Sequence, residues 1–295
     1  YTEITNEYLE NVYNKMLKEK YDFTRLFLGS YPLESQEKMK RRGNSWNGYR
    51  RKPLHWNINF DLIFNNFYYN ISMITVSNFA YLKITNNCIK SIEKCNIKCP
   101  LKIFCIDKKT LDYLQNNNYT PCEYLNDVQD TLADYCDKNW SKVTMQKIYS
   151  IRNELDNAPF VIYIDGDIVI ENSNFITYCY EELLKNPDID ILAQSEWKGE
   201  HNKNEICSGF MFIRSNEKTK KLFTVEENKY YPNDQFYVNE KRNMCNVKLL
   251  PISLYPNGKY FYENKNFNPY LIHFNFVKSH DKINRMKGYK KWYLN

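Results

Sequence analysis

Two carboxylates stand directly after an apolar run in the middle of the chain. Residues 160–164 read Phe-Val-Ile-Tyr-Ile, and Asp165, Gly166 and Asp167 follow. Carboxylates two positions apart, with a small residue between them, can turn toward one divalent cation, and their hard oxygens suit Mg²⁺ or Mn²⁺ that also contacts substrate phosphates. A polar turn is the plain alternative, because Asp and Gly favour turns. With only 8 glycines in 295 residues, the glycine at this place favours the metal site.

The segments around this motif alternate between strand and helix patterns. This βαβα order predicts an α/β fold with a mostly parallel sheet. Ligands of such open sheets bind at the carboxyl ends of the strands, where Asp165 and Asp167 stand. Residues 255–269, rich in Asn and Tyr and containing a Pro-Asn-Gly run, predict a long loop. Strands are expected at 71–76, 101–106, 160–164, 189–193, 206–213 and 247–251, and helices at 81–93, from 108, at 141–155 and at 175–184.

Composition describes a folded protein with a mild positive charge. Hydrophobic residues make up 43% and charged residues 26%, and the formal net charge is +6. This balance suits phosphate-bearing ligands, and without RNA-binding signatures it argues against a nucleic-acid partner. The mean hydropathy is -0.69, and no run approaches the roughly 20 apolar residues that a membrane span requires. We therefore expect no membrane span.

Cysteine usage gives the expected compartment. The 9 cysteines are an odd number, are scattered, and contain no C-x-x-C pair, so neither a zinc cluster nor a disulfide framework is indicated. A reducing compartment, the cytoplasm, is favoured. The chain begins at Tyr1 rather than at Met, which leaves open whether a signal or anchor precedes it.

Residues 1–69 differ from the rest and are interpreted as an N-terminal extension, with residues 70–295 as the catalytic domain. The stretch Tyr8–Leu17 is amphipathic, and its apolar face must be covered by the catalytic domain or by a second subunit. A homodimer is therefore one expectation. The basic run Lys38–Arg42 is interpreted as a solvated face.

Further motifs accompany Asp165-Gly-Asp167 along residues 70–295. They are Thr75-Val-Ser-Asn78 with Tyr81, Thr144-Met-Gln-Lys147, Cys207-Ser-Gly-Phe-Met211, Asn233-Asp-Gln235 and His273-Phe-Asn-Phe276. In this order they resemble the nucleotide-diphospho-sugar transferase family of GT-A glycosyltransferases. The resemblance implies a GT-A fold, which is Rossmann-like with a mostly parallel central sheet and flanking helices, here with the N-terminal extension added.

The resemblance also implies a metal site formed by Asp165, Asp167 and His273, with Mn²⁺ or Mg²⁺ as the cofactor. A divalent cation together with Lys or Arg stabilises the negative charge that develops on a diphosphate leaving group. A lone histidine is more often structural, and His280 is a competing ligand candidate.

Donor-binding and catalytic roles follow from the same resemblance. Asp234 and Gln235 are the implied catalytic residues beside the donor sugar. The alternative is that these residues open a helix and that Asn or Asp there is simply its N-cap. An aromatic face such as that of Tyr81 suits a nucleobase. Ser279 stands where the family often has glycine, which leaves open which basic residue reaches the phosphates. The implied nucleotide and donor residues are Thr75, Val76, Asn78, Tyr81, Lys147, Asp165, Gly166, Ser208, Gly209, Lys278 and Lys282.

The expected function is a metal-dependent hexosyl- or pentosyltransferase. It would move a sugar from a nucleotide-sugar donor, a UDP-sugar by the resemblance, to a hydroxyl acceptor on a glycan or protein. The resemblance favours retention over inversion of the anomeric configuration. Inversion would require a carboxylate base, for which Asp234 and Glu196 are candidates.

Two other functions compete with this expectation. Asp165-Gly-Asp167-Ile-Val also resembles a haloacid-dehalogenase-like phosphatase, in which Asp165 would be the nucleophile. That group usually has the motif near its N-terminus and a later acidic pair, whereas several βα units precede the motif here. A non-catalytic sugar-nucleotide binder is the second alternative, and the intact Asp165, Asp167 and His273 argue against it.

Overall fold

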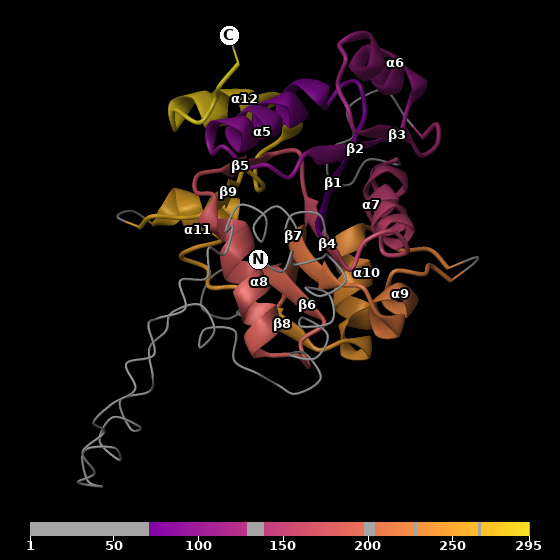
Figure 1. Cartoon of the computed structure of the whole chain (residues 1–295). Helices are drawn as coiled ribbons and strands as arrows, with labels where there is room; N and C mark the ends of the chain where they lie inside the picture. Colours follow the sequence, from indigo (N-terminus) through magenta and orange to yellow (C-terminus); the bar gives the residue numbers. More distant parts are fainter. Residues whose placement is uncertain (1–70, 129–138, 198–203, 227–228, 265–266, 295) are drawn as a thin grey trace, which may run out of the picture. The chain divides into compact units, whose positions relative to one another are not determined.

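A seven-stranded sheet forms the centre of the protein in the computed structural model, which describes residues 71–128, 139–197, 204–226, 229–264 and 267–294. Strand β7 alone runs antiparallel to both of its neighbours, and the other strand pairs are parallel. The predicted α/β class with a mostly parallel sheet is confirmed. The strands, in their order across the sheet (Figure 1), are β3 (Cys122–Tyr124), β2 (Leu101–Cys105), β1 (Ile71–Ser77), β4 (Phe160–Ile164), β7 (Ile206–Arg214), β6 (Ile191–Ser195) and β8 (Val247–Leu249).

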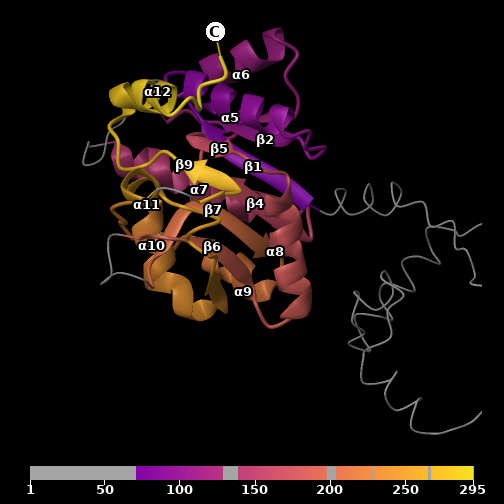
Figure 2. The same ribbon diagram turned by 90° about the vertical axis from the view of Figure 1, so that its left-hand side faces the viewer.

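Helices cover both faces of this sheet. On one face Ile162 and its neighbours pack against α5 (Leu82–Lys94) and α8 (Asn174–Lys185). On the other face Val161 and Tyr163 pack against α7 (Trp140–Glu154) and α10 (Asp234–Lys241). Figures 1 and 2 show α8 and α10 on opposite sides of the sheet. Because both faces are buried, β4 consists of apolar residues throughout, as strands of parallel sheets do.

The remaining helices lie at the edges of the sheet and along the C-terminal segment. Asp107 caps α6 by accepting a hydrogen bond from Thr110 N at 2.7 Å, and Asn257 caps α11 by accepting one from Tyr260 N at 3.0 Å. Such side-chain caps satisfy backbone N–H groups that a helix start leaves without partners. These helices are α6 (Lys108–Asn116), α9 (Glu217–Leu222), the short 3₁₀ helix η1 (Arg242–Met244), α11 (Gly258–Glu263) and α12 (Ser279–Gly288).

A second, two-stranded sheet joins two distant parts of the chain. Strand β5 (Ile168–Ile170) pairs antiparallel with β9 (Leu271–His273), and Ile168 stands opposite His273. Helices α5 and α12 cover this small sheet through a cluster that includes Ile84 and Met286. Both helices lie together at the top of Figure 1. The pairing brings β9 to the segment that directly follows Asp167.

Most predicted elements agree with the structure to within about two residues at each end. The prediction of an uninterrupted loop over 255–269 is wrong, because α11 lies within it. The composition of that segment suggested a loop, but Asn257 acts there as a helix cap. The predicted extension, residues 1–69, lies outside the described residues and stays a prediction. All described residues belong to one compact unit.

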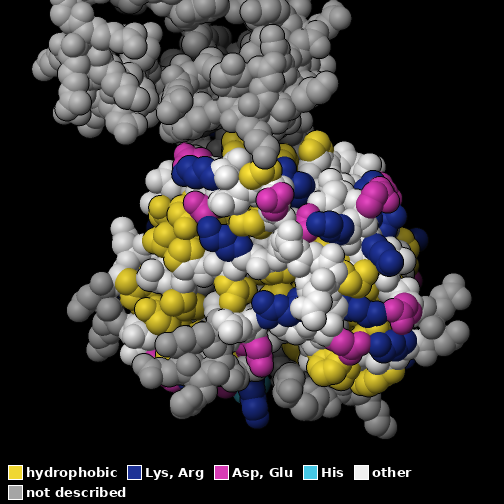
Figure 3. All heavy atoms as spheres, turned by 90° about the horizontal axis from the view of Figure 1, so that it is seen from below, with side chains coloured by type: hydrophobic (Ala, Val, Ile, Leu, Met, Phe, Trp, Pro, Cys, Tyr) yellow, Lys and Arg dark blue, Asp and Glu magenta, His cyan; other side chains and the backbone are white. Residues whose placement is uncertain are grey.

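Charges of both signs are mixed on one face of the protein. On the face shown in Figure 3, Lys and Arg side chains are interspersed with Asp and Glu rather than gathered into one basic area. None of the helices in the described residues is long and apolar enough to cross a membrane. The eight cysteines in the described ranges are all free thiols.

Candidate active site

The site lies where the strand order of the main sheet changes direction. Strands β1 and β4 are parallel neighbours, and β2 lies beyond β1 while β7 lies beyond β4. Crevices at the carboxyl ends of such strands are the usual ligand sites of open α/β sheets. Asn78 follows β1 there and Asp165 follows β4. The structure therefore places the Asp-Gly-Asp motif at the expected edge of the sheet.

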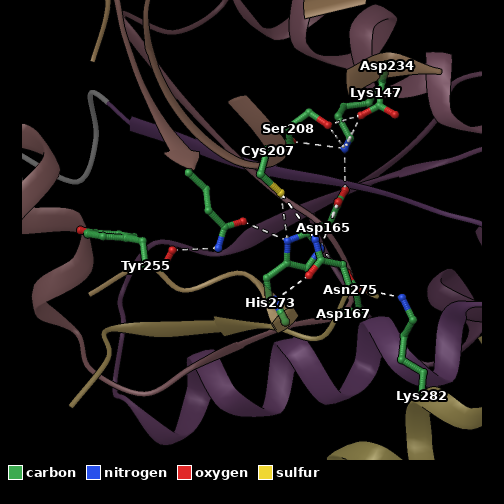
Figure 4. A network of polar contacts seen from close by, with 12 residues as sticks. Lys147, Asp165, Asp167, Cys207, Ser208, Asp234, Tyr255, His273, Asn275 and Lys282 are labelled. Atoms are coloured by element: carbon green, nitrogen blue, oxygen red, sulfur yellow. Dashed lines mark hydrogen bonds and ion pairs between the residues drawn. The ribbon is translucent and has the colours of Figure 1, made fainter. Parts of the chain in front are cut away.

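Asp165, Asp167 and His273 converge on one point. One ligand atom from each lies within 4.8 Å of the other two. His273 Nε2 is 3.3 Å from Asp167 Oδ1 and 3.6 Å from Asp165 Oδ2 (Figure 4). Two carboxylates and one imidazole form a donor set that accepts Mn²⁺ or Mg²⁺. Asp167 and His273 are buried, whereas the Asp165 side chain is 26% exposed, so a cation in this group can also contact a ligand from the outside.

Gly209 makes room for this convergence. Asp165 N donates to Gly209 O at 2.8 Å. A Cβ on Gly209 would clash with the His273 ring, lying 2.6 Å from Nδ1, and it would lie 2.9 Å from Asp165 Oδ2. Only glycine therefore permits the imidazole and the carboxylate to approach the strand so closely. The sequence pointed to Gly209 as a donor-sugar contact, and the structure adds this steric role.

Lys147 connects the cluster of Asp165, Asp167 and His273 to the start of α10. Its Nζ lies 2.9 Å from Asp165 Oδ1 and 2.6 Å from Asp234 Oδ2. Ser208 Oγ donates to the same Asp234 oxygen at 2.5 Å, and Lys147 Nζ donates to Ser208 O at 3.2 Å. Burial acts to lower the pKa of Lys147, but the charges of Asp165 and Asp234 outweigh it and raise that pKa above its usual value. Lys147 therefore stays charged, and four residues predicted separately from sequence form one network.

Lys282 is the second buried cation of the site. Its Nζ donates to Asp167 Oδ2 at 2.5 Å and lies 5.6 Å from the centre of the Tyr81 ring. Burial acts to raise the pKa of Asp167, but the charge of Lys282 outweighs it and holds that pKa far below its usual value. Asp167 is therefore ionised, as a cation ligand must be. Lys278 is exposed at the N-cap of α12, so the two predicted lysines lie in different environments.

The segment after β1 is held by its own contacts. Asn78 Oδ1 accepts from Tyr81 N at 3.0 Å, which stabilises the start of α5. Tyr81 lies against Lys282, and burial followed by the negative charge of Asp167 raises the pKa of its phenol. Thr75 is fully buried, and among the described residues its Oγ1 has no hydrogen-bond partner. Val76 is half-buried beside it.

Gly166 is the second glycine position that the site depends on. A Cβ there would lie 2.6 Å from Thr85 Oγ1, so glycine lets the turn between Asp165 and Asp167 pass close to α5. Thr85 is itself buried and shares a hydrogen bond of 2.9 Å with Ser77 Oγ.

The N-cap of α10 is not Asp234 but the residue before it. Asn233 is the N-cap of α10, and its Oδ1 accepts from Phe236 N at 2.7 Å. Asp234 is the first residue of the helix, is buried, and faces Lys147 and Ser208 instead. Gln235 is half-buried on the next position of the helix.

Sequence reasoning missed three residues of the site. The Tyr163 ring lies 4.9 Å from Lys147 Nζ, and burial followed by the negative charge of Asp165 raises the pKa of its phenol. Gln194 Oε1 lies 2.9 Å from His273 Nδ1, and Cys207 Sγ lies 3.5 Å from the same atom. One signal was present, because Gln194 and Ser195 are polar residues at the carboxyl end of a strand that begins with Ile-Leu-Ala.

Comparison with known proteins gives a family and more distant similarities. The model of the nucleotide-diphospho-sugar transferase family matches residues 100–286. A UDP-galactose:fucoside alpha-3-galactosyltransferase of Dictyostelium discoideum is 23% identical in an alignment 287 residues long that covers 77% of this chain. The chain spans 43% of the length of that relative.

Solved structures with a similar arrangement are also glycosyltransferases. A glycosyltransferase involved in the glycosylation of the major capsid of PBCV-1 gives a TM-score of 0.47 at 13% identity, covering 74% of this chain and 98% of that one. The galactosyltransferase LgtC, in complex with donor and acceptor sugar analogues, gives 0.45 at 11% identity, covering 68% of this chain and 86% of that one.

Proposed function

Because this chain belongs to the nucleotide-diphospho-sugar transferase family, we propose that it is a metal-dependent glycosyltransferase that moves a hexosyl or pentosyl group from a UDP-sugar to a hydroxyl acceptor on a glycan or protein. The observation that carries the proposal is the convergence of Asp165, Asp167 and His273, with two buried lysines attached to it. Galactose is the first sugar to test, since the curated relative is named for UDP-galactose.

The residues present fit a divalent cation. Asp165 and Asp167 would supply oxygens, and His273 would supply Nε2, the ring nitrogen that faces both carboxylates. A cation bound there acts as a Lewis acid on the diphosphate leaving group. Lys282, beside Asp167, adds a fixed positive charge at the same place, and such preorganised charge stabilises a leaving group that becomes more negative.

Asp234 is proposed as the group that orients the donor sugar. Its Oδ2 is held by Lys147 at 2.6 Å and by Ser208 at 2.5 Å, so the carboxylate has a fixed direction. A carboxylate with two partners on one oxygen is suited to positioning sugar hydroxyls. This arrangement supports retention over inversion, which would require a base open to the acceptor. Gln235, the next residue of α10, is proposed for the anomeric carbon.

The acceptor is proposed to occupy a cavity of about 350 Å³ between α7 and the segment that precedes α10. Tyr231 in its wall precedes Asp234 by three residues, and Gln146 precedes Lys147 on α7, so the cavity and the donor network are built from the same two segments of the chain. Aromatic faces combined with a few polar groups form the kind of pocket that holds a polar organic ligand. The wall includes Ser141, Lys142, Gln146, Tyr149, Tyr230 and Tyr231.

A donor-hydrolysis screen tests the function directly. The full chain with Mn²⁺ is incubated with a panel of UDP- and GDP-sugars, and the released nucleoside diphosphate is measured. We expect release from a UDP-hexose, lost on chelation with EDTA and restored by Mn²⁺. Phosphate release from phosphomonoesters, with all sugar nucleotides left intact, would instead support the phosphatase alternative with Asp165 as nucleophile.

The anomeric outcome is read from the product of the same reaction. Transfer to a simple sugar acceptor gives a glycoside whose anomeric proton reports α or β linkage by NMR. We expect an α product from an α-linked UDP-sugar. A β product would overturn retention without affecting the assignment as a transferase.

A further inference from the structure

Gln194 contacts His273 at Nδ1, the ring nitrogen opposite the one that faces Asp165 and Asp167. We propose that it is a positioning residue that keeps His273 protonated on Nδ1, so that the lone pair of Nε2 faces Asp165 and Asp167. The proposal rests on the metal site described above and assigns a role to a side chain outside the three ligands.

The orientation of the Gln194 amide follows from its other contacts. Gln194 is fully buried, and its Nε2 donates to Tyr255 O at 3.1 Å and to Pro256 O at 2.8 Å. An amide nitrogen has two hydrogens, and both are used here. The reversed orientation would place Oε1 against two carbonyl oxygens, which is repulsive. The amide therefore presents Oε1, and not its nitrogen, to His273.

The tautomer of His273 follows from this orientation. Gln194 Oε1 lies 2.9 Å from His273 Nδ1. An amide oxygen can only accept a hydrogen bond, so Nδ1 must donate it. In a neutral imidazole the other nitrogen then has the lone pair. Nε2 is the nitrogen at 3.3 Å from Asp167 Oδ1 and 3.6 Å from Asp165 Oδ2, and it is thereby set for a cation.

A second polar atom, the Cys207 sulfur, flanks the same ring nitrogen. Cys207 Sγ lies 3.5 Å from His273 Nδ1 and accepts from Asn275 Nδ2 at 3.6 Å. The Asn275 amide is oriented in turn, because its Oδ1 accepts from Gly258 N at 2.6 Å. Both polar neighbours of Nδ1 are thus arranged by fixed donors. Such outer contacts on a ligating histidine fix its tautomer and ring orientation.

An irregularity in the sheet places these two neighbours together. The pairing of β6 with β7 runs regularly up to Ala193, which stands opposite Met211, and then shifts so that Gln194 stands opposite Cys207. Continued in register, the pairing would have placed Phe210 there. Irregularities of this kind re-aim side chains beside active sites. Here the shift brings an amide and a thiol, rather than a phenyl ring, to the histidine.

The test uses the full chain and a pair of matched variants. Gln194→Met keeps the length of the side chain and removes its polar atoms. Asn257→Leu is the control, because Asn257 is also a fully buried amide bonded to backbone at both ends, to Tyr260 N and to Trp197 O. Neither of these bonds involves His273. Loss of stability alone should therefore be common to both variants.

Two measurements read the outcome. Long-range ¹H–¹⁵N NMR spectra of the metal-free protein, recorded at a pH high enough that the His273 ring is neutral, report which ring nitrogen has the proton. The His273 signals are identified by their absence in His273→Ala. Titration with Mn²⁺ alone, followed by the EPR signal of free Mn²⁺, gives the affinity. We expect the Nδ1–H form in the wild type and in Asn257→Leu. In Gln194→Met we expect a mixture of tautomers and an affinity lower by about 10- to 100-fold.

Several results would overturn the proposal. An Nε2–H tautomer in the wild-type chain would do so without any variant. So would a folded Gln194→Met that keeps the Nδ1–H form and a Mn²⁺ affinity within about twofold of wild type. If the wild type takes up no Mn²⁺, the proposed metal site fails, and the tautomer measured in the metal-free protein still decides the role of Gln194.

Discussion

Lys282 Nζ lies 2.5 Å from Asp167 Oδ2, while the other oxygen of the same carboxylate lies 3.3 Å from His273 Nε2. Asp167 thus has two tasks, as a proposed cation ligand and as the counter-ion of a buried lysine. Removal of one partner of a buried ion pair leaves an uncompensated charge and typically costs 3–5 kcal/mol. The effects of mutating Asp167 on metal binding and on folding must therefore be separated.

A double variant at Asp167 and Lys282 separates the effect on metal binding from the effect on folding. We expect Asp167→Ala to abolish Mn²⁺-dependent turnover and to lower the free energy of unfolding by about 3 kcal/mol, because Lys282 is left buried without its partner. Adding Lys282→Met should recover most of that stability and none of the turnover. Urea unfolding and donor hydrolysis are measured on the same samples. Turnover of Asp167→Ala within a few-fold of wild type would contradict the ligand assignment.

The ion pair between Asp167 and Lys282 predicts a pH dependence of stability. The pKa of Asp167 is lowered in the folded protein, so its contribution is present above the unfolded-state pKa, for which the usual value is 3.8, and is lost as pH falls toward the folded value. The pKa of Lys282 is raised, so its contribution is present below its usual pKa of 10.5 and declines only at higher pH.

We therefore expect the stability difference between the wild type and Asp167→Asn to stay constant from about pH 5 to 9 and to shrink below about pH 4. Urea unfolding of the metal-free proteins across this range measures it. Asp156→Asn is a suitable control, since Asp156 forms exposed ion pairs with Arg152 and Lys220 that contribute little. A difference that grows in acid would contradict the ion-pair account.

The two late histidines should respond differently to metal. His273 is buried between the carboxylates, whereas His280 is exposed and lies 3.2 Å from the exposed Asp281. His273→Ala should weaken Mn²⁺ binding at least tenfold, and His280→Ala should leave it within about twofold. Coinciding titration curves for the two variants would refute His273 as a ligand.

How far the sequence could predict this site depends on how local each contact is. Asp165 and Asp167 were predictable because they follow β4 without interruption and the carboxyl edge of a parallel sheet is the general ligand site. The position of His273 depends on the pairing of β5 with β9, more than 100 residues apart, and local periodicity does not specify such pairing. His273 was instead predicted as a ligand from the order of motifs that resembles the family. The position of Gln194 beside His273 depends on a register shift between β6 and β7. Single-sequence patterns give no signal for such a shift.

The proposed acceptor cavity predicts a split between transfer and hydrolysis. Tyr149 is 43% exposed in the cavity wall. Tyr149→Ala should raise the KM for a saccharide acceptor several-fold, since stacking area is lost, while hydrolysis of donor without acceptor stays near wild type. Tyr113→Ala is the matched control, because Tyr113 is 42% exposed on α6 and outside that wall. An unchanged acceptor KM in Tyr149→Ala would remove the cavity from consideration.

The N-terminal extension, residues 1–69, gives a prediction that the described residues do not address. It lies outside the motifs of the donor site and contains the amphipathic stretch Tyr8–Leu17 and the basic run Lys38–Arg42. If the extension serves the acceptor, a chain that begins at Asn70 should still hydrolyse donor slowly and transfer sugar poorly, with transfer reduced much further than hydrolysis. Circular dichroism and thermal unfolding first establish that the shortened chain is folded, because an uncovered apolar face could destabilise it. Equal losses of transfer and hydrolysis in a folded chain, measured with one donor, would assign the extension to general stability instead.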